Sequence, residues 1–331
     1  MKTVAKSRAE SFRGDKGVRR LERVRMRAWL SGLTGGKAVI GIPYFWLLVF
    51  FLLPFFIVLR ISVAEMETVT FKDLLTYVDG SLQLKLKLSN YIFIAEDPLY
   101  FKTYLNSLMY AAVTTVMCLF IGYPFAYFMA RAKPTTQPIL LMLVMLPFWT
   151  SFLLRVYAWK GLLSDGGWVS NFLIGIGADH VLMFAGLIAA EGKFMNTPFS
   201  LIIGMVYTYL PFMILPLYAN LAKMDLRLLE AAADLGCAPF LAFWKITVPL
   251  SKAGIIAGSM LVFIPCIGEF VIPELLGGPQ TLMIGRVLWD EFFSNNDWPM
   301  ASSVAVVMVL LILVPLAIFN KYQAQANEVR R

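Results

Sequence analysis

The chain has 331 residues, of which 59% are hydrophobic and only 15% are charged, and its mean hydropathy is +0.71. Soluble globular domains are about half apolar and about a quarter charged. The composition therefore excludes a water-soluble protein and indicates a membrane protein. The three cysteines show no CxxC spacing, so neither a disulfide framework nor a cysteine metal site is expected.

Runs without charged residues predict six transmembrane helices. A helix needs about 20 mostly apolar residues to cross a bilayer. Five runs reach this length directly, whereas the run 253–268 reaches it only by continuing past Glu269. Two shorter runs, 166–178 and 180–190, contain glycine and predict interfacial or re-entrant segments. The six predicted helices cover residues 38–60, 105–130, 138–160, 200–222, 254–274 and 300–320.

The basic residues outside these helices predict the orientation in the membrane. Residues 1–37 carry 11 Lys or Arg and 3 Asp or Glu, and basic residues accumulate on the cytoplasmic side. The sequence therefore predicts a basic cytoplasmic tail at 1–37, a six-helix domain at 38–320 and a cytoplasmic tail at 321–331. Attraction to anionic lipids, at about 1 kcal/mol per basic residue, explains the first tail better than nucleic-acid binding. The first apolar run is longer than the core of a cleaved signal peptide, so we expect it to remain as an anchor.

The predicted cytoplasmic loop 223–252 has the pattern of two short helices. Both carry apolar stripes, made of Leu228, Leu229, Ala232, Leu235, Phe240, Phe243, Trp244 and Val248. Gly236 can end the first helix in a left-handed conformation, Pro239 suits the first turn of the second helix, and Pro249 is expected to stop it. Two short helices joined at a glycine bend predict a rigid knob at the membrane face, and such a knob needs a groove on a partner.

The spacing of residues in this loop resembles the EAA loop of ABC importer permeases. Six positions match, namely Glu230, Ala231, Ala232, Gly236, Ile246 and Pro249, while Val248 stands where the family pattern usually has Leu. The resemblance implies an all-α, polytopic membrane protein with six transmembrane helices and the type I ABC importer permease fold. It also implies that the loop sits in a cleft of a cytoplasmic ATPase and couples it to the membrane helices. The alternative is an ordinary amphipathic loop helix.

Four further segments resemble the polyamine class of these permeases. They are LPFWTSFLLRVYAW (146–159), YLPFMILPLY (209–218), GEFVIPELLGGP (268–279) and DWP (297–299). The third of them looks closer to the putrescine permease than to its spermidine counterpart. The resemblance therefore implies transport of a polyamine, with putrescine preferred and spermidine as the alternative, in a bacterial inner membrane with both termini in the cytoplasm.

The resemblance also implies partners. These are a second homologous permease that forms a heterodimer with this chain, two ATPase subunits, and a periplasmic polyamine-binding protein. The chain itself has no nucleotide site, because Gly36-Lys37 and Gly192-Lys193 both fail the GxxxxGK[ST] pattern. We therefore expect a transport subunit that is not an enzyme and holds no cofactor, with ATP and Mg²⁺ bound by the ATPase.

A path for a dication should offer carboxylates and aromatic faces to its ammonium groups, since cation–π contacts contribute about 0.5–2 kcal/mol each. Glu269 is the strongest candidate, because it lies roughly 22 Å along the fifth predicted helix and a charge inside a span is costly. It either faces the cargo or is a structural acid, protonated or paired with Arg286 or Arg155. Glu274 is either a solvated acid at the outer rim or a direct ligand.

Aromatic side chains on the third and fourth predicted helices are further candidates for the path: Trp149, Tyr157, Tyr207 and Tyr209. Aromatic residues in membrane helices also pack or form interfacial belts, so both roles stay open. Gly254 and Gly258 allow close approach of another helix and are weak evidence for the heterodimer contact. The single histidine, His180, has no second histidine or cysteine beside it, so no metal site is expected.

Two other transport functions fit parts of the pattern. An ATP-independent secondary transporter often shows inverted repeats with broken helices in matching positions, and the sequence shows no internal repeat. An ABC permease for an anion should carry basic residues along its spans, whereas the deep charge found here, Glu269, is acidic.

Overall fold

The computed structural model describes residues 37–67, 70–71, 75–78, 81–84 and 87–328. The predicted N-terminal tail, apart from Lys37, and the last three residues of the predicted C-terminal tail lie outside these ranges. The chain forms two compact units, Met1–Arg60 and Ile61–Arg331.

The described part of the first unit is a single apolar helix. It runs through α2 (Lys37–Leu47), a π-helical turn (Leu48–Leu52) and α3 (Leu53–Ser62), whose last residues belong to the second unit. Residues Ile40–Ser62 are long and apolar enough to cross a membrane. This segment matches the first predicted span, 38–60.

The second unit begins with two small hairpins that the sequence did not predict. Strand β1 (Met66–Glu67) pairs antiparallel with β2 (Thr70–Phe71), and β3 (Leu75–Val78) pairs antiparallel with β4 (Ser81–Leu84). The short helix α4 (Ser89–Glu96) follows. From there on, the described chain is helical, which confirms the predicted all-α class apart from these hairpins.

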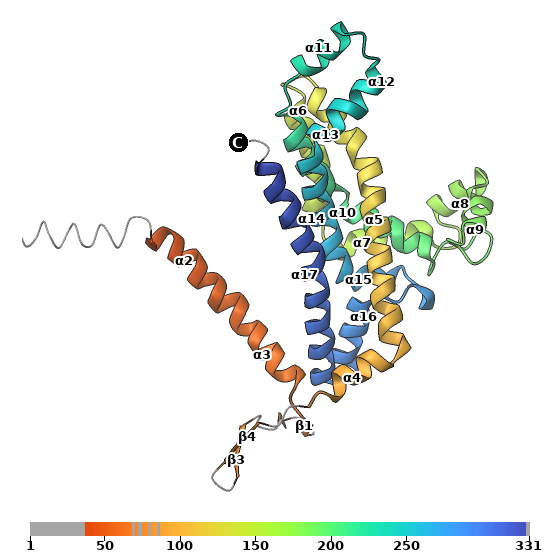
Figure 1. Cartoon of the computed structure of the whole chain (residues 1–331). Helices are drawn as coiled ribbons and strands as arrows, with labels where there is room; N and C mark the ends of the chain where they lie inside the picture. Colours follow the sequence, from red (N-terminus) through yellow and green to blue (C-terminus); the bar gives the residue numbers. More distant parts are fainter. Residues whose placement is uncertain (1–36, 68–69, 72–74, 79–80, 85–86, 329–331) are drawn as a thin grey trace, which may run out of the picture. The chain divides into compact units, whose positions relative to one another are not determined.

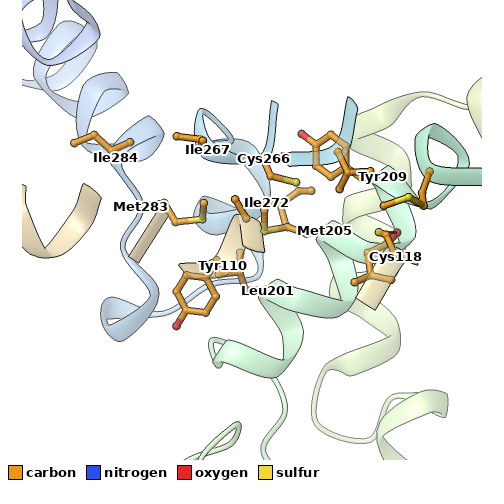
Figure 2. Close-up of a cluster of buried hydrophobic side chains, with 14 of the residues drawn as sticks. Tyr110, Cys118, Leu201, Met205, Tyr209, Cys266, Ile267, Ile272, Met283 and Ile284 are labelled. Atoms are coloured by element: carbon orange, nitrogen blue, oxygen red, sulfur yellow. Dashed lines mark hydrogen bonds between the residues drawn. The ribbon is translucent and has the colours of Figure 1, made fainter. Parts of the chain in front are cut away.

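Four helices form the bundle of the second unit (Figure 1): α5 (Pro98–Arg131), α10 (Pro198–Leu221), α14 (Lys252–Ile267) and α17 (Trp298–Glu328). The first three pack on one another through a buried apolar cluster that also includes residues of α15 and α16, and Figure 2 shows part of it.

Polar side chains cap the N-termini of two of these helices. Asp97 accepts a hydrogen bond from the amide of Leu99 at 2.8 Å, and Asp297 accepts one from the amide of Met300 at 2.9 Å.

The third predicted span, 138–160, is not one straight helix. It consists of α6 (Gln137–Met145), a 3₁₀ turn (Leu146–Trp149) and α7 (Phe152–Leu163), and the two halves meet at an angle of 88°. Thr150 and Ser151 have extended backbone conformations at the break. The 3₁₀ turn contains Pro147, which has no N–H for a helical hydrogen bond. The break therefore follows a segment that cannot continue a regular α-helix.

The fifth predicted span, 254–274, is also broken. Helix α14 ends at Ile267, and a separate short helix, α15 (Val271–Leu275), follows. At its other end, α14 meets the preceding segment Pro239–Leu250 at 65°. The described residues thus contain four helices long enough to span a membrane, or up to six if each bent pair is counted as one span.

Two groups of short elements complete the described part of the unit. The predicted interfacial segments at 166–190 form α8 (Trp168–Gly175) and α9 (Ala178–Phe184), which lie to one side of the bundle (Figure 1). Between α15 and α17 the chain forms a 3₁₀ turn (Pro279–Thr281), α16 (Ile284–Trp289) and a π-helical turn (Asp290–Ser294).

Gly254 and Gly258 lie where α14 packs directly on α10. A Cβ atom at Gly254 would stand 2.8 Å from Cβ of Asn220, and one at Gly258 would stand 2.8 Å from Sδ of Met213 and 3.1 Å from its carbonyl oxygen. The two glycines therefore serve a contact within this chain. This finding replaces the interpretation of the pair as a contact with a second subunit.

We expect Gly258→Ala to lower the stability of the protein, because the added methyl group must displace Met213. Overpacking of this kind costs about 1–3 kcal/mol. The control is Gly161→Ala in α7, where a Cβ atom would meet nothing within 4 Å. Thermal unfolding of the purified chain in detergent should show a lower midpoint for the first variant and an unchanged or higher midpoint for the second. Equal midpoints would contradict the close packing of α14 on α10.

Candidate functional site

The segment between α10 and α14 forms the predicted pair of short helices, called here the two-helix loop (residues 223–252). It contains α11 (Arg227–Asp234), α12 (Pro239–Ala242), a π-helical turn (Phe243–Thr247) and α13 (Val248–Leu250). In Figure 1, α11 and α12 lie at one end of the second unit, whereas α4 lies at the other end.

The bend between the two helices depends on Gly236. Its φ angle is +77°, and the space around it is open, so glycine is needed for the backbone conformation and not for room. The amides of Gly236 and Cys237 donate to the carbonyls of Ala233 and Ala232, each at 2.9 Å, which satisfies the end of α11. The predicted glycine bend and the start of the second helix at Pro239 are therefore confirmed.

The second helix ends one residue later than the predicted stop at Pro249. The helix continues to Leu250, and the 65° bend follows at Ser251. A π-helical turn at Phe243–Thr247 directly precedes this proline. In such a turn the regular i to i−4 hydrogen bonds are already interrupted, so the missing N–H of a proline disturbs the helix less.

The two-helix loop has a buried side and an exposed apolar side. Ala232, Ala242 and Thr247 are buried, whereas Leu235 is 88% exposed, Phe240 77% and Trp244 55%. Of the six positions that carry the EAA spacing, Ala232 is buried, Ile246 is half-buried and the other four are exposed. The loop therefore presents large apolar side chains on the knob that the sequence predicted.

One aromatic side chain connects the two-helix loop to the bundle. The ring of Phe243 packs edge-on against the rings of Tyr123 and Tyr127 on α5, with centroid distances of 5.6 and 5.7 Å. The hydroxyl of Tyr123 also shares a hydrogen bond of 2.8 Å with Ser251 at the bend before α14. A displacement of the loop would therefore act directly on α5 and α14.

Glu269 lies at the break between α14 and α15. Its Oε2 accepts a hydrogen bond of 2.5 Å from the hydroxyl of Tyr209, and its Oε1 accepts from the amides of Val271 at 3.1 Å and Ile272 at 3.4 Å. The carboxylate thus satisfies the first amides of α15, where a negative charge is favourable. Two of the predicted path residues, Glu269 and Tyr209, are brought together. Figure 2 shows Tyr209 close to Cys266 at the end of α14.

Neither arginine that the sequence suggested as a partner of Glu269 forms that pair among the described residues. Nε of Arg286 lies 2.6 Å from Glu274 and 3.9 Å from Asp290. The guanidinium carbon of Arg155 instead lies over the rings of Phe148 and Phe152, at 5.7 and 5.9 Å. The partners of Glu269 are a tyrosine hydroxyl and the backbone, since α15 begins close enough for its amides to reach the carboxylate.

The other aromatic candidates occupy separate positions. The ring of Tyr207 packs against Trp159 on α7 with a centroid distance of 5.6 Å. Trp149 is 78% exposed in the 3₁₀ turn before the break, and Tyr157 is 55% exposed on α7. The structure therefore places Trp149 and Tyr157 on an outer surface and packs Tyr207 within the fold.

Glu274 lines a cavity of about 510 Å³ together with Arg286, Asp290 and Asn196. Beside it the ring of Trp289 stacks on Phe270 at 4.4 Å and contacts Phe293 at 4.2 Å. Sequence reasoning missed Asp290 and this aromatic stack. The cluster of two acidic and three aromatic residues at 289–293, shortly before the last predicted span, is the signal that could have found them.

The part of the chain that the structure describes contains no group of three His, Cys, Asp or Glu side chains that could hold a metal ion. His180 lies 3.4 Å from Glu191, and both side chains are largely exposed.

A solved structure shares this architecture. It is a chain of a bacterial ABC transporter involved in the import of the acidic polysaccharide alginate, with a TM-score of 0.60, 15% sequence identity, and coverage of 92% of this chain and 99% of that chain. The likeness concerns the fold. The helical bundle with its two-helix loop thus has the type I fold of ABC importer permeases.

Two curated relatives are similar over most of their length. The spermidine/putrescine transport system permease protein PotB of Haemophilus influenzae is 38% identical over 288 residues, which cover 87% of this chain and 93% of the relative. The protein of the same name from Escherichia coli K12 is 36% identical over 283 residues, covering 86% and 96%. The model of the family described as binding-protein-dependent transport system inner membrane component matches residues 29–328. The chain therefore belongs to this family of multi-pass inner-membrane permeases.

Proposed function

We propose that this chain is the permease subunit of an ATP-driven importer of polyamines. The proposal is supported by family membership and by the two relatives, whose names include both spermidine and putrescine. The expectation of putrescine as the preferred cargo, based on residues 268–279, finds no support in those names. We therefore include spermidine and favour it over putrescine.

The exposed apolar side of the two-helix loop is the proposed contact with a separate ATPase. Leu235, Phe240 and Trp244 form an anchor of the kind that fills a pocket on a partner. Closure of two ATPase subunits would move this anchor, and Phe243 would pass the movement to α5 through Tyr123 and Tyr127. ATP and Mg²⁺ belong to the ATPase, and this chain contributes the path.

The position of the two-helix loop determines the proposed orientation of the chain in the membrane. The two-helix loop meets the ATPase in the cytoplasm, and α17 runs from the α4 end of the second unit toward the loop end (Figure 1), so the C-terminus also faces the cytoplasm. With six crossings, the N-terminus lies on the same side. The α4 end then faces the periplasm, where a polyamine-binding protein would deliver the cargo to the heterodimer with a second, homologous permease.

The proposed cargo contacts are Glu269 at the break after α14 and Glu274 in the cavity near α16. The first carboxylate is held by Tyr209, and the second already binds Arg286. Both carboxylates would interact with the ammonium groups of a polyamine. Trp149 and Tyr157 would offer exposed aromatic faces, whereas Tyr207 is committed to packing.

Labelled spermidine uptake into vesicles tests the proposed function. The vesicles hold this chain with its neighbour-encoded permease and ATPase, and the binding protein is supplied at the outer face. We expect uptake that requires ATP and is competed by excess spermidine and, more weakly, by putrescine. Uptake without ATP would favour a secondary transporter, and an assembled complex that takes up no polyamine would contradict the proposed cargo.

Phe240→Ala tests the contact with the ATPase. The side chain is 77% exposed, so its removal should not impair folding, yet truncation of an anchor residue costs about 2 kcal/mol or more, about 30-fold in affinity. We expect less ATPase to co-purify and ATP-driven uptake to fall. The matched control is Phe184→Ala on α9, which is 95% exposed and lies outside the two-helix loop. Equal losses in both variants, or no loss in either, would count against the coupling role.

Glu269→Gln tests the half-buried carboxylate at the break after α14. The amide keeps one oxygen for Tyr209 or the backbone but loses the charge for an ammonium group. Hydrogen bonds to charged groups contribute about 1.5–3 kcal/mol, so spermidine uptake should fall by about tenfold or more while assembly with the ATPase is unchanged. Glu191→Gln, at an exposed position beside His180, is the control. Uptake by Glu269→Gln at the wild-type rate would leave Glu269 as a structural cap of α15.

A further inference from the structure

Arg155 is a half-buried, charged side chain that has no polar partner among the residues that the structure describes. Its Nε and Nη1 atoms are buried and have no hydrogen-bond partner in the described ranges of the chain. The rings of Phe148 and Phe152 are its near neighbours, at 5.7 and 5.9 Å from the guanidinium carbon. Cation–π contact offsets part of the cost of burying the charge, but ring faces leave most of the five N–H donors of an arginine without acceptors.

This arrangement is expensive because an arginine cannot give up its proton in a protein. A buried carboxylic acid or lysine can become neutral, whereas a buried guanidinium must find an acceptor. Within membrane spans such residues pair with one another, with carbonyls or with a water-filled cavity. Because Glu269 is bound to Tyr209 and the backbone, the acceptor for Arg155 has to come from elsewhere.

The position of Arg155 favours another protein over a lipid headgroup. It lies in the first turn of α7, directly after the 88° break. The preceding helical stretch Gln137–Trp149 rises about 20 Å from its start at about 1.5 Å per residue. The hydrocarbon layer is about 30 Å thick, so this depth is well inside it if the start of α6 lies at the membrane surface. The nearer edge of that layer is then about 10 Å away, and the guanidinium lies over the rings of Phe148 and Phe152 instead of extending toward the headgroups.

The surface around Arg155 is also suited to a protein partner. Trp149 is 78% exposed, Leu154 65% and Tyr157 55%, and they lie on both sides of the break. Aromatic residues and arginine are enriched in protein interfaces. A positively charged group within an apolar surface is complementary to a single carboxylate surrounded by apolar side chains.

We propose that Arg155 forms an ion pair with a carboxylate of the second permease subunit, and that the break between α6 and α7 is part of that interface. This inference rests on the proposed function, because it requires the heterodimer. Rotation of the guanidinium from the two rings toward the partner completes the pair, and rotamer changes of this kind are common when interfaces form.

Arg155→Met distinguishes this pair from an arginine that is merely unpaired. Methionine has a similar length and no charge. If Arg155 has no partner, its removal relieves a buried charge, and assembly stays the same or improves. If it pairs with a carboxylate, the substitution leaves that carboxylate buried and alone, and assembly weakens.

The experiment co-expresses the tagged full-length chain with the neighbour-encoded permease, the ATPase and the binding protein, and measures recovery of the second permease in mild detergent. We expect Arg155→Met to insert normally and to be at least as heat-stable as the wild type when expressed alone. Its recovery of the second permease should fall by at least about tenfold. Lys160→Met, at an exposed position on the same helix, is the matched control and should recover the permease normally.

A photo-crosslinking amino acid at Leu154 identifies the neighbour directly. Crosslinks to the second permease would support the pair. A charge swap would support it further, if Arg155→Glu together with a lysine in place of the crosslinked carboxylate restores recovery of the second permease. Three results would overturn the pair. They are recovery of the second permease by Arg155→Met at the wild-type level, crosslinks from Leu154 to lipid alone, and an Arg155→Met substitution that no longer lowers this recovery once Glu269→Gln is also present. A wild-type chain that recovers no second permease at all would instead contradict the proposed function.

Discussion

The close packing of α14 on α10 is the contact on which both parts of the candidate site depend. Helix α10 carries Tyr209 and leads into the two-helix loop, and α14 begins after the loop and ends next to Glu269. Gly254 and Gly258 let the two backbones approach until a single methyl group would not fit. In a membrane the hydrophobic effect does not drive helices together, so they associate through close van der Waals packing, which small residues allow. The loop and the carboxylate are therefore connected by one closely packed pair of helices.

Breaks in the helices determine where polar chemistry can occur. Inside a bilayer every free backbone group needs a partner, and the break after Ile267 frees the amides that begin α15. The carboxylate of Glu269 accepts two of them and holds Tyr209 with its other oxygen. The acid thus has a structural reason to be there, and the same oxygens are the negative atoms that an ammonium group would meet. A structural and a transport role for Glu269 are compatible, because the backbone amides fix the carboxylate in place.

The sequence predicted the features that depend on composition and local backbone chemistry. Charge-free runs located the helices, and Gly236 and Pro239 located the bend and the second helix of the loop. Hydropathy carries no information on backbone direction, so the 88° break near Thr150 and the end of α14 at Ile267 were missed. Contacts between distant segments were missed as well, because spacing alone does not show that Arg286 meets Glu274 or that Gly258 meets Met213.

The electrostatics of the two breaks indicate why a single chain is an incomplete path for a polycation. Glu269 lies beside one break and Arg155 beside the other, so their formal charges cancel within this chain. A dication approaching an uncompensated guanidinium is repelled, and in a medium of low dielectric constant that repulsion is stronger than in water. A carboxylate from a second subunit would neutralise Arg155 and leave Glu269 as the charge that the cargo meets. Assembly of the two subunits would then remove the positive charge that repels the cargo, in addition to enclosing the path.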